Sequence, residues 1–211
     1  MTAVQDHWQR VYHRREPQEM SWYEPAAGIS LALIQEAQLP PDAAIIDAGG
    51  GTSKLAGQLL EAGYTDITVA DISLRALQRA QLELTGARRI HWVQADLRRH
   101  SFGRRYDLWH DRAVFHFMVD PTDREHYLAN LRASLLPGGH LILATFGPDG
   151  PTRCSALPVT DYSIGQLAAV LRPDFKLISS HQIDHATPSG TTQRFIYTHL
   201  RRTSDSCLGA T

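Results

Sequence analysis

Short apolar runs alternate along the chain with longer stretches in which apolar residues recur every three or four positions. The runs have the length and apolar character of buried parallel strands and cover residues 43–48, 66–71, 89–96, 106–111 and 139–147. The periodic stretches predict helices over 52–63, 73–86 and 121–139, each bounded by capping residues, proline or glycine. Strand and helix in alternation, with short connections, predict an α/β fold with a doubly wound parallel sheet.

The two ends of the chain depart from this alternation. After a predicted helix over 163–173, two β-rich segments, 175–185 and 192–202, flank a turn that contains Pro188 and Gly190. They predict an antiparallel hairpin at one sheet edge. Two predicted helices, 3–14 and 26–39, precede the first strand. We therefore expect one domain over residues 1–202, with an N-terminal helical cap at 1–40 and a disordered tail at 203–211.

Composition narrows the classes of partner. The 211 residues are 43% hydrophobic, which suffices for one sizeable core, and 21 Lys and Arg against 22 Asp and Glu give a net charge of −1. This balance does not predict a nucleic-acid partner. There is no signal-like segment and no apolar stretch long enough to span a bilayer, so we expect a cytoplasmic protein without membrane contact. The scattered histidines and the two cysteines predict no metal site.

The turn after the first strand, "DAGGGTS" at residues 47–53, is the strongest candidate for ligand binding. Glycines let the backbone approach a ligand closely, and the helix that follows offers free N–H groups. Glycines also serve tight turns that bind nothing. A dinucleotide fingerprint would need a third glycine at position 54, where Lys54 stands, so the turn predicts a different nucleotide-type pocket.

Asp47, Asp71 and Asp96 each end one of three successive predicted strands. Parallel strands end at the same edge of a sheet, so these side chains are expected to gather there. A carboxylate at Asp71, twenty residues after Gly51, can accept hydrogen bonds from both hydroxyls of a ribose, which would suit NAD equally well. A single aspartate after a strand can also be a simple cap, but three together favour a nucleoside site.

An acidic residue followed by G-x-G, here Asp47, Gly49 and Gly51, with Ser53 in place of a further glycine, resembles class I S-adenosylmethionine-dependent methyltransferases. The resemblance covers residues 43–200 and includes "LLPGGHLILATF". It implies a seven-stranded, Rossmann-like sheet with its last strand inserted antiparallel, and S-adenosylmethionine as methyl donor. The donor-binding residues that it implies are Trp22, Tyr23, Asp47, Gly49, Gly51, Ser53, Asp71, Ile72, Asp96, Leu97 and His110.

Within that resemblance, Asp71 would bind the ribose and Asp96 would accept the adenine amino group. Ile72 and Leu97 would cover the two faces of the adenine. The aromatic rings of Trp22 and Tyr23 would shield the sulfonium, since a cation is attracted to a π face, or would simply pack.

The acceptor side is expected near "LWHDRAVFHF" at the exit of the fourth strand and near the Pro-rich loop that carries Cys154. A histidine beside a carboxylate can act as a base, or bind an anion together with an arginine. In the alternative interpretation the same side chains shape the methionine end of the pocket and the arginine forms an ion pair. The predicted catalytic residues are His110, Asp111, Arg112 and His116, and the predicted substrate-binding residues are Phe115, His116 and Cys154.

The chain also resembles a small bacterial subgroup related in pattern to lysine methyltransferases such as the citrate synthase enzyme. "HDRA" occupies the place of a D/N-P-P-Y/F motif, which argues against methylation of a base amine or a glutamine amide. We predict a small-molecule methyltransferase, with a thiol or sulfide-like acceptor favoured because few carboxylates are available to hold a lysine. The alternatives are a protein-lysine N-methyltransferase and a non-catalytic, nucleoside-binding regulatory protein.

Overall fold

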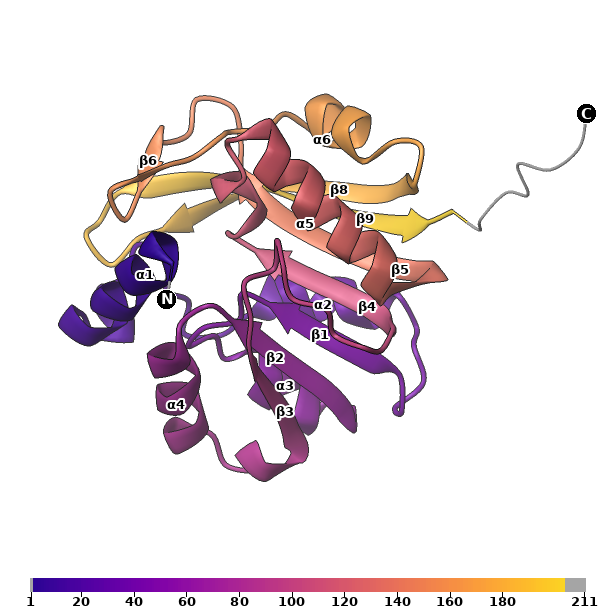
Figure 1. Ribbon diagram of the computed structural model, residues 1–211, viewed down its shortest axis with the longest axis horizontal. Coiled ribbons are helices and arrows are strands. Elements are labelled where there is room, and N and C mark those ends of the chain that lie inside the picture. Colours follow the sequence, from indigo (N-terminus) through magenta and orange to yellow (C-terminus); the bar gives the residue numbers. More distant parts are fainter. Residues whose placement is uncertain (1, 204–211) are drawn as a thin grey trace, which may run out of the picture.

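The structure is a computed structural model that describes residues 2–203. Seven strands form one sheet in the order β3-β2-β1-β4-β5-β9-β8 (Figure 1). The strands are β1 (Ala44–Ala48), β2 (Asp66–Asp71), β3 (Ile90–Gln94), β4 (Tyr106–Arg112), β5 (Leu135–Phe146), β8 (Phe175–Ala186) and β9 (Thr192–Arg202). Two further short strands, β6 (Arg153–Cys154) and β7 (Leu157–Pro158), pair with each other.

Helices connect and cover the strands. The α-helices are α1 (Ala3–Arg14), α2 (Gly28–Glu36), α3 (Leu55–Glu61), α4 (Leu74–Glu83), α5 (Pro121–Ser134) and α6 (Ile164–Leu171). Side chains cap several helix starts: Ser73 accepts from the backbone N–H of Ala76, and Asp120 accepts from that of Thr122. Short 3-10 turns lie at Pro17–Glu19, Ala87–Arg89 and Phe115–Phe117.

The sheet topology confirms the predicted fold class. β1 pairs in parallel with both β2 and β4, and β4 pairs in parallel with β5. β9 lies antiparallel between β5 and β8, so the C-terminal hairpin closes one edge, as expected (Figure 1). Strand order reverses at β1, which makes the carboxyl ends of β1 and β4 the switch point where α/β sheets bind ligands.

The predicted boundary at residue 139, between a helix and the strand after it, is wrong for an identifiable reason. The helix expected over 121–139 ends at Ser134, and Leu135 already pairs with Tyr106 as part of β5. Gly138 has a φ of +76°, and a Cβ on Gly139 would lie 3.0 Å from the carbonyl oxygen of Asp107. The Pro-Gly-Gly sequence is therefore an irregularity inside a strand, where the neighbouring backbone comes close, and not the end of a helix.

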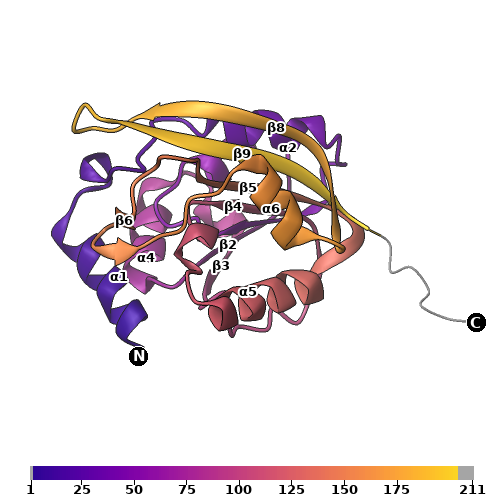
Figure 2. The ribbon, with the colours of Figure 1, turned by 90° about the horizontal axis from the view of Figure 1, so that it is seen from above.

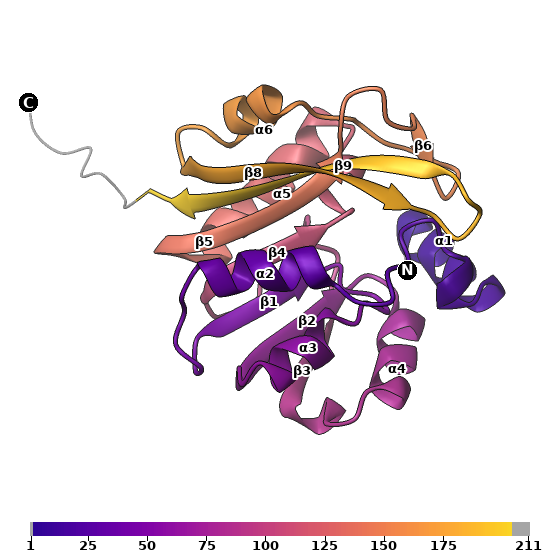
Figure 3. The same ribbon diagram turned by 180° about the vertical axis from the view of Figure 1, so that it is seen from behind.

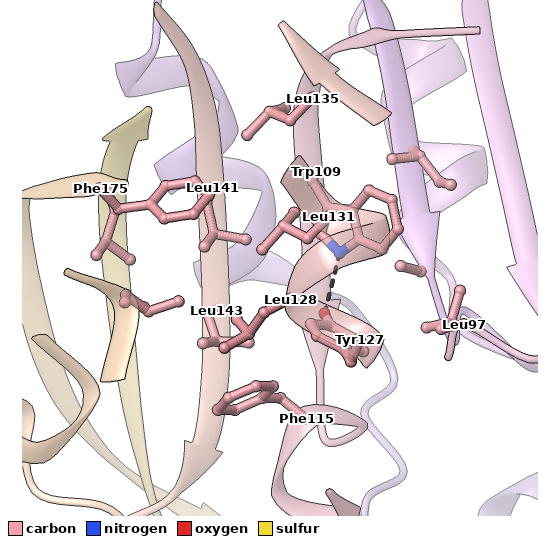
Figure 4. Close-up of a cluster of buried hydrophobic side chains, with 14 of the residues drawn as sticks. Leu97, Trp109, Phe115, Tyr127, Leu128, Leu131, Leu135, Leu141, Leu143 and Phe175 are labelled. Atoms are coloured by element: carbon pink, nitrogen blue, oxygen red, sulfur yellow. Dashed lines mark hydrogen bonds between the residues drawn. The ribbon is translucent and has the colours of Figure 1, made fainter. Parts of the chain in front are cut away.

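Two apolar layers hold the sheet. On one face, α5 and α6 pack over Trp109, whose Nε1 donates to the Tyr127 hydroxyl at 3.1 Å (Figure 4). On the other face, α2 and α3 cover Ile45 and Ile67, both fully buried (Figure 3). Burial of each such side chain stabilises the fold by about 1.5–3 kcal/mol.

Helix α1 lies outside these layers, beside the small β6–β7 sheet (Figures 1 and 2). Hydrogen bonds join it to the start of α4: the side-chain Oε1 of Gln9 accepts from the Ser73 hydroxyl at 3.0 Å and from the backbone N–H of Arg75 at 3.1 Å. Among residues 2–203, no helix combines the length and apolar character needed to cross a membrane. Residues 204–211 of the predicted tail lie outside the described part of the chain.

Candidate active site

The glycine turn after β1 is built onto the neighbouring strand. The N–H groups of Gly49 and Gly50 donate to the carbonyl of Ala70 at 2.7 and 3.1 Å. Gly49 and Gly51 have φ angles of +80° and +51°. A Cβ on Gly49 would collide with the Val114 side chain, and one on Gly51 with the Tyr12 hydroxyl. The turn therefore requires glycine for its backbone conformation and for the close approach of its neighbours.

Asp47, in β1, is 2% exposed. One of its carboxylate oxygens accepts from Nδ1 of His110 at 2.8 Å, which leaves Nε2 of His110 to accept from the Ser30 hydroxyl at 2.9 Å. The other oxygen, Oδ2, has no hydrogen-bond partner among the described residues, although Asp47 lines the main cavity. A buried acceptor without a partner costs about 1–3 kcal/mol, which a ligand donor in the cavity would recover.

Asp71 stands at the end of β2 and also faces this cavity. Its Oδ1 accepts from the N–H of Ser73 at 2.7 Å. Burial, aided by the charge of Asp47, raises the pKa of Asp71 from 3.8 to about 7, against hydrogen bonds from Ser73 and Gly51 that lower it. Hydroxyl donors from a ligand would favour the ionised carboxylate.

Asp96 follows β3 and is held by an arginine that sequence reasoning missed. Both of its oxygens accept from the Arg98 guanidinium, at 2.9 and 2.7 Å, and Arg98 also donates to Asp123 at 2.6 Å. Although burial alone would raise it, Arg98 holds the pKa of Asp96 below its usual value. The predicted contact with an adenine amino group stays a prediction, and Arg98 would share the carboxylate with it.

The cavity has a volume of about 670 Å³ and lies over the carboxyl ends of β1, β2 and β4. Aromatic rings enclose it on the side of α1: Trp8 lies 5.8 Å from Trp22 and 5.2 Å from Phe117, ring centre to ring centre. Trp8 and Tyr12 were not predicted, although their spacing of four residues on a helix is the signal that could have found them. An apolar wall is completed by Phe146, at the end of β5, and by Leu157 and Pro158, which form β7.

Arg112, at the end of β4, ties the segment before α2 to the sheet. It donates to the Tyr197 hydroxyl and to the carbonyl of Trp22, both at 2.8 Å, and pairs with Glu24 at 2.8 Å. His185 donates to the carbonyl of Ser21 at 2.8 Å. The structure thus contains the ion pair of the alternative interpretation, and Arg112 fixes the wall that carries Trp22.

Four residues predicted to act in catalysis or acceptor binding do not line the cavity: His110, Asp111, Phe115 and His116. Asp111 is fully buried and accepts from the Tyr127 hydroxyl at 2.5 Å, and burial raises its pKa to about 6. The ring of His116 stacks on Phe146 at 4.4 Å, and burial lowers its pKa to about 3, so it is neutral. Their proposed chemical roles stay predictions, and these contacts favour positioning roles.

Most of the other predicted residues meet around the cavity. Gly51 belongs to the glycine turn but does not itself line the cavity. Cys154 is 7% exposed, and burial raises its pKa to about 11, so its thiol is protonated at neutral pH. Within residues 2–203, no group of three or more His, Cys, Asp or Glu side chains could hold a metal ion. The predicted residues that line the cavity are Trp22, Tyr23, Asp47, Gly49, Ser53, Asp71, Ile72, Asp96, Leu97, Arg112 and Cys154.

Comparison with known families and sequences gives matches over the central part of the chain. Residues 45–139 match the methyltransferase domain family. Malonyl-[acyl-carrier protein] O-methyltransferase of Halalkalibacterium halodurans is 32% identical over 50% of this chain and 40% of its own length, so the chain spans less than half of that relative. EEF1A lysine methyltransferase 2 of Danio rerio is 26% identical over 83% of this chain and 76% of its own length.

Solved structures extend the similarity of fold to nearly the whole chain. A structure concerned with conversion of a disulfide bond into a thioacetal group in echinomycin biosynthesis matches with a TM-score of 0.75. It is 19% identical and covers 98% of this chain and 94% of its own. The 1,6-didemethyltoxoflavin-N1-methyltransferase of Burkholderia thailandensis, solved with S-adenosylhomocysteine, matches with a TM-score of 0.72 at 21% identity, over 95% and 88% of the two chains.

Proposed function

We propose that the chain methylates a small molecule, because residues 45–139 match the methyltransferase domain family and the chain has the fold of class I S-adenosylmethionine-dependent methyltransferases. The acceptor atom that we favour is sulfur, in a thiol or sulfide. The observation that carries the proposal is the cavity at the switch point, which Asp47 and Asp71 both line.

The cavity fits S-adenosylmethionine, the cofactor of this family. Asp71 would accept hydrogen bonds from the ribose hydroxyls, and Oδ2 of Asp47, which lacks a partner among the described residues, would accept from the ammonium group of the methionine part. The rings of Trp8 and Trp22 would stabilise the sulfonium by cation–π attraction. When bound, the cofactor supplies an electrophilic methyl group, and the chain excludes water from it and aligns the acceptor.

The side chains around the cavity favour an acceptor that loses its proton without help. Both ring nitrogens of His110 are engaged, and His116 is buried away from the cavity lining. Glu24, a carboxylate on the cavity wall, is paired with Arg112. A thiol yields some thiolate near neutral pH, whereas an amine needs a base.

A protein lysine is the second candidate acceptor, because EEF1A lysine methyltransferase 2 of Danio rerio aligns with 83% of this chain. A lysine side chain needs an open approach to the methyl group and carboxylates to attract its charge. The wall formed by Phe146, Leu157 and Pro158 is apolar, and the cavity carboxylates Glu24 and Asp123 are already paired with arginines, which favours the small apolar acceptor.

The test is incubation of the full chain with methyl-labelled S-adenosylmethionine, first with aromatic and alkyl thiols, then with amines and carboxylic acids, and finally with a cell lysate. A labelled small product from a thiol supports the proposal. A labelled protein band would favour lysine methylation, and donor binding without any turnover would favour a regulatory nucleoside-binding protein.

A matched variant links activity to the site. Asp71→Asn should weaken donor binding in calorimetry by about 2–4 kcal/mol, because hydrogen bonds to a charged acceptor are lost. Asp42→Asn, an exposed aspartate, is the control and should bind the donor like the wild type. Equal affinity of both variants would place the donor elsewhere.

A further inference from the structure

A second hollow lies between the segment of residues 98–105 and helix α5, and its volume is about 460 Å³. The segment connects β3 to β4 without a helix and carries the sequence "RRHSFGRR". No acidic residue lines this hollow, in a chain whose net charge is −1. Its basic lining residues are Arg98, Arg99, His100, Arg104, Arg105 and His126.

Two of these positive charges are already neutralised within the protein, and two are not. Arg98 pairs with Asp96 and Asp123, and Arg104 pairs with Asp66. Arg99 and Arg105 are exposed, and among the described residues neither guanidinium group has an ion pair or hydrogen bond; the backbone N–H of Arg99 donates to the carbonyl of Asp96 at 2.9 Å. The hollow therefore holds two guanidinium groups whose donors are free, on either side of the turn at Gly103.

The floor of the hollow is fixed by the fold. Phe102 packs its ring edge against Tyr106 at 5.8 Å and against Trp109 at 5.7 Å, which anchors the segment between the two arginine pairs. Asn130, on α5, donates to the carbonyl of Leu97 at 2.7 Å and accepts from the Ser134 hydroxyl at 3.2 Å. The first bond joins α5 to the residue before the segment, and the second, within α5, orients the Asn130 amide.

The hollow is separate from the donor cavity. The two share Arg98 alone among their lining residues, and its guanidinium is engaged by Asp96 and Asp123 between them. S-adenosylmethionine carries no phosphate, so the donor gives no reason for this concentration of positive charge.

We propose that this hollow binds a multiply charged anion of the phosphate class, such as a phosphate monoester or a pyrophosphate group. The guanidinium presents paired N–H donors that match the oxygens of a phosphate, and charge-assisted bonds of this kind are among the strongest polar contacts in proteins. The mutual repulsion of like charges in the free protein is relieved when such an anion binds. The site is independent of the acceptor proposed for the cavity.

Calorimetric titration of the full chain with inorganic pyrophosphate at low ionic strength tests the proposal. We expect saturable binding that Arg99→Ala with Arg105→Ala weakens roughly tenfold or more. The control pair is Arg88→Ala with Arg89→Ala, which removes two adjacent exposed arginines that line neither cavity and should leave the affinity unchanged. Circular dichroism confirms that both variants are folded.

Two additions to the titration separate the hollow from other sources of binding. Saturating S-adenosylhomocysteine should not displace pyrophosphate, and displacement would assign the anion to the donor cavity and overturn the proposal. An equal loss in both arginine pairs would show unspecific attraction, which also overturns it. Absence of pyrophosphate binding, or binding of a polyglutamate peptide in its place, would show that the surface does not take a phosphate-class ligand.

Discussion

At the scale of single residues, the cavity depends on two aspartates that the fold removes from water. Asp47 and Asp71 are 2% and 6% exposed, and the charge of Asp47 adds to the effect of burial on Asp71. Sequence pattern predicts both positions, because each ends a strand at the switch point. It does not predict the role of Arg98. The hydrogen bonds from Arg98 to Asp96 depend on the backbone conformation of residues 95–105, which form no helix.

The raised pKa of Asp71 predicts a pH dependence of stability. Its pKa is about 7 in the folded chain against an ordinary 3.8, so between these pH values the unfolded chain ionises this group and the folded chain does not. Stability from the group is therefore fully present below the unfolded pKa and is lost as pH rises through about 7. Asp71→Asn should remove this loss, worth roughly 4 kcal/mol at most.

Urea unfolding at several pH values between the two pKa values and above them measures this effect. The control is Asp42→Asn, an exposed site whose unfolding free energy should follow the wild-type pH profile. If the unfolding free energy of Asp71→Asn follows the same pH profile as the wild type, the pKa of Asp71 is not raised in the folded chain. Its carboxyl is then ionised below pH 7, contrary to the pKa of about 7.

His116 provides a second prediction at this scale. Its Nδ1 accepts from the N–H of Phe146 at 3.4 Å, its ring is buried, and it does not line the cavity. With a thiol acceptor, His116→Gln should keep the pH dependence of kcat, because the residue does not handle the proton. A 10²- to 10⁴-fold loss of turnover that high pH restores would instead identify His116 as a general base.

At the scale of elements, the glycine turn is fixed by what surrounds it. Gly49→Ala should destabilise the chain by more than about 1 kcal/mol, because its φ of +80° is strained for a side chain and Val114 occupies the space. Gly165, in α6, has no neighbour within 4 Å of its Cβ position, so Gly165→Ala is the control and should be neutral or stabilising. Thermal melts compare the two, and equal melting temperatures would contradict the account of the turn.

The hydrogen bonds and ion pair of Arg112 are expected to hold in place the segment that carries Trp22. Lysine cannot reproduce the contacts that the guanidinium makes to Tyr197, Trp22 and Glu24. Arg112→Lys should therefore speed proteolysis within residues 15–27 and weaken donor binding by about 1–3 kcal/mol. Arg104→Lys, at the surface pair with Asp66, should change neither. Unaltered proteolysis in Arg112→Lys would show that other contacts hold the segment.

Element boundaries show where sequence pattern stops being informative. The helix predicted over 3–14 has these bounds in the structure, where the Thr2 side chain caps its start and His13 and Arg14 lie in its last turn. The sequence pattern could not show that Leu135 belongs to β5, because an apolar residue at this point fits the last turn of a helix as well as the start of a strand. Only its pairing with Tyr106 in the structure assigns it to the strand. In the 3-10 turn at 115–117, Phe117 lines the cavity, whereas Phe115 and His116 point into the core, a difference that the sequence pattern does not show.

At the scale of the whole molecule, the N-terminal helix and the sheet meet around one cavity, and a hydrogen bond links its wall to the C-terminal hairpin. Trp8 comes from α1, Asp47 from β1 and Arg112 from β4, and Arg112 bonds in turn to Tyr197 of β9. The residues that line the cavity come from between Val4 and Pro158, a grouping that apolar periodicity along the chain cannot reveal. A ligand bound there contacts these segments directly and is linked to β9 only through Arg112.

Donor binding should accordingly raise the melting temperature of the whole chain in a single transition. A ligand at one hundred times its Kd adds about 2.7 kcal/mol, and each kcal/mol shifts the melting temperature of a chain of this size by about 2–4 °C. S-adenosylhomocysteine should thus raise it by roughly 5–11 °C. Asp71→Asn should show little of this rise at the same concentration, while Asp42→Asn shows all of it. A shift confined to one of two separate transitions would mean that the elements around the cavity unfold independently, because a ligand stabilises only the unit that unfolds with its site.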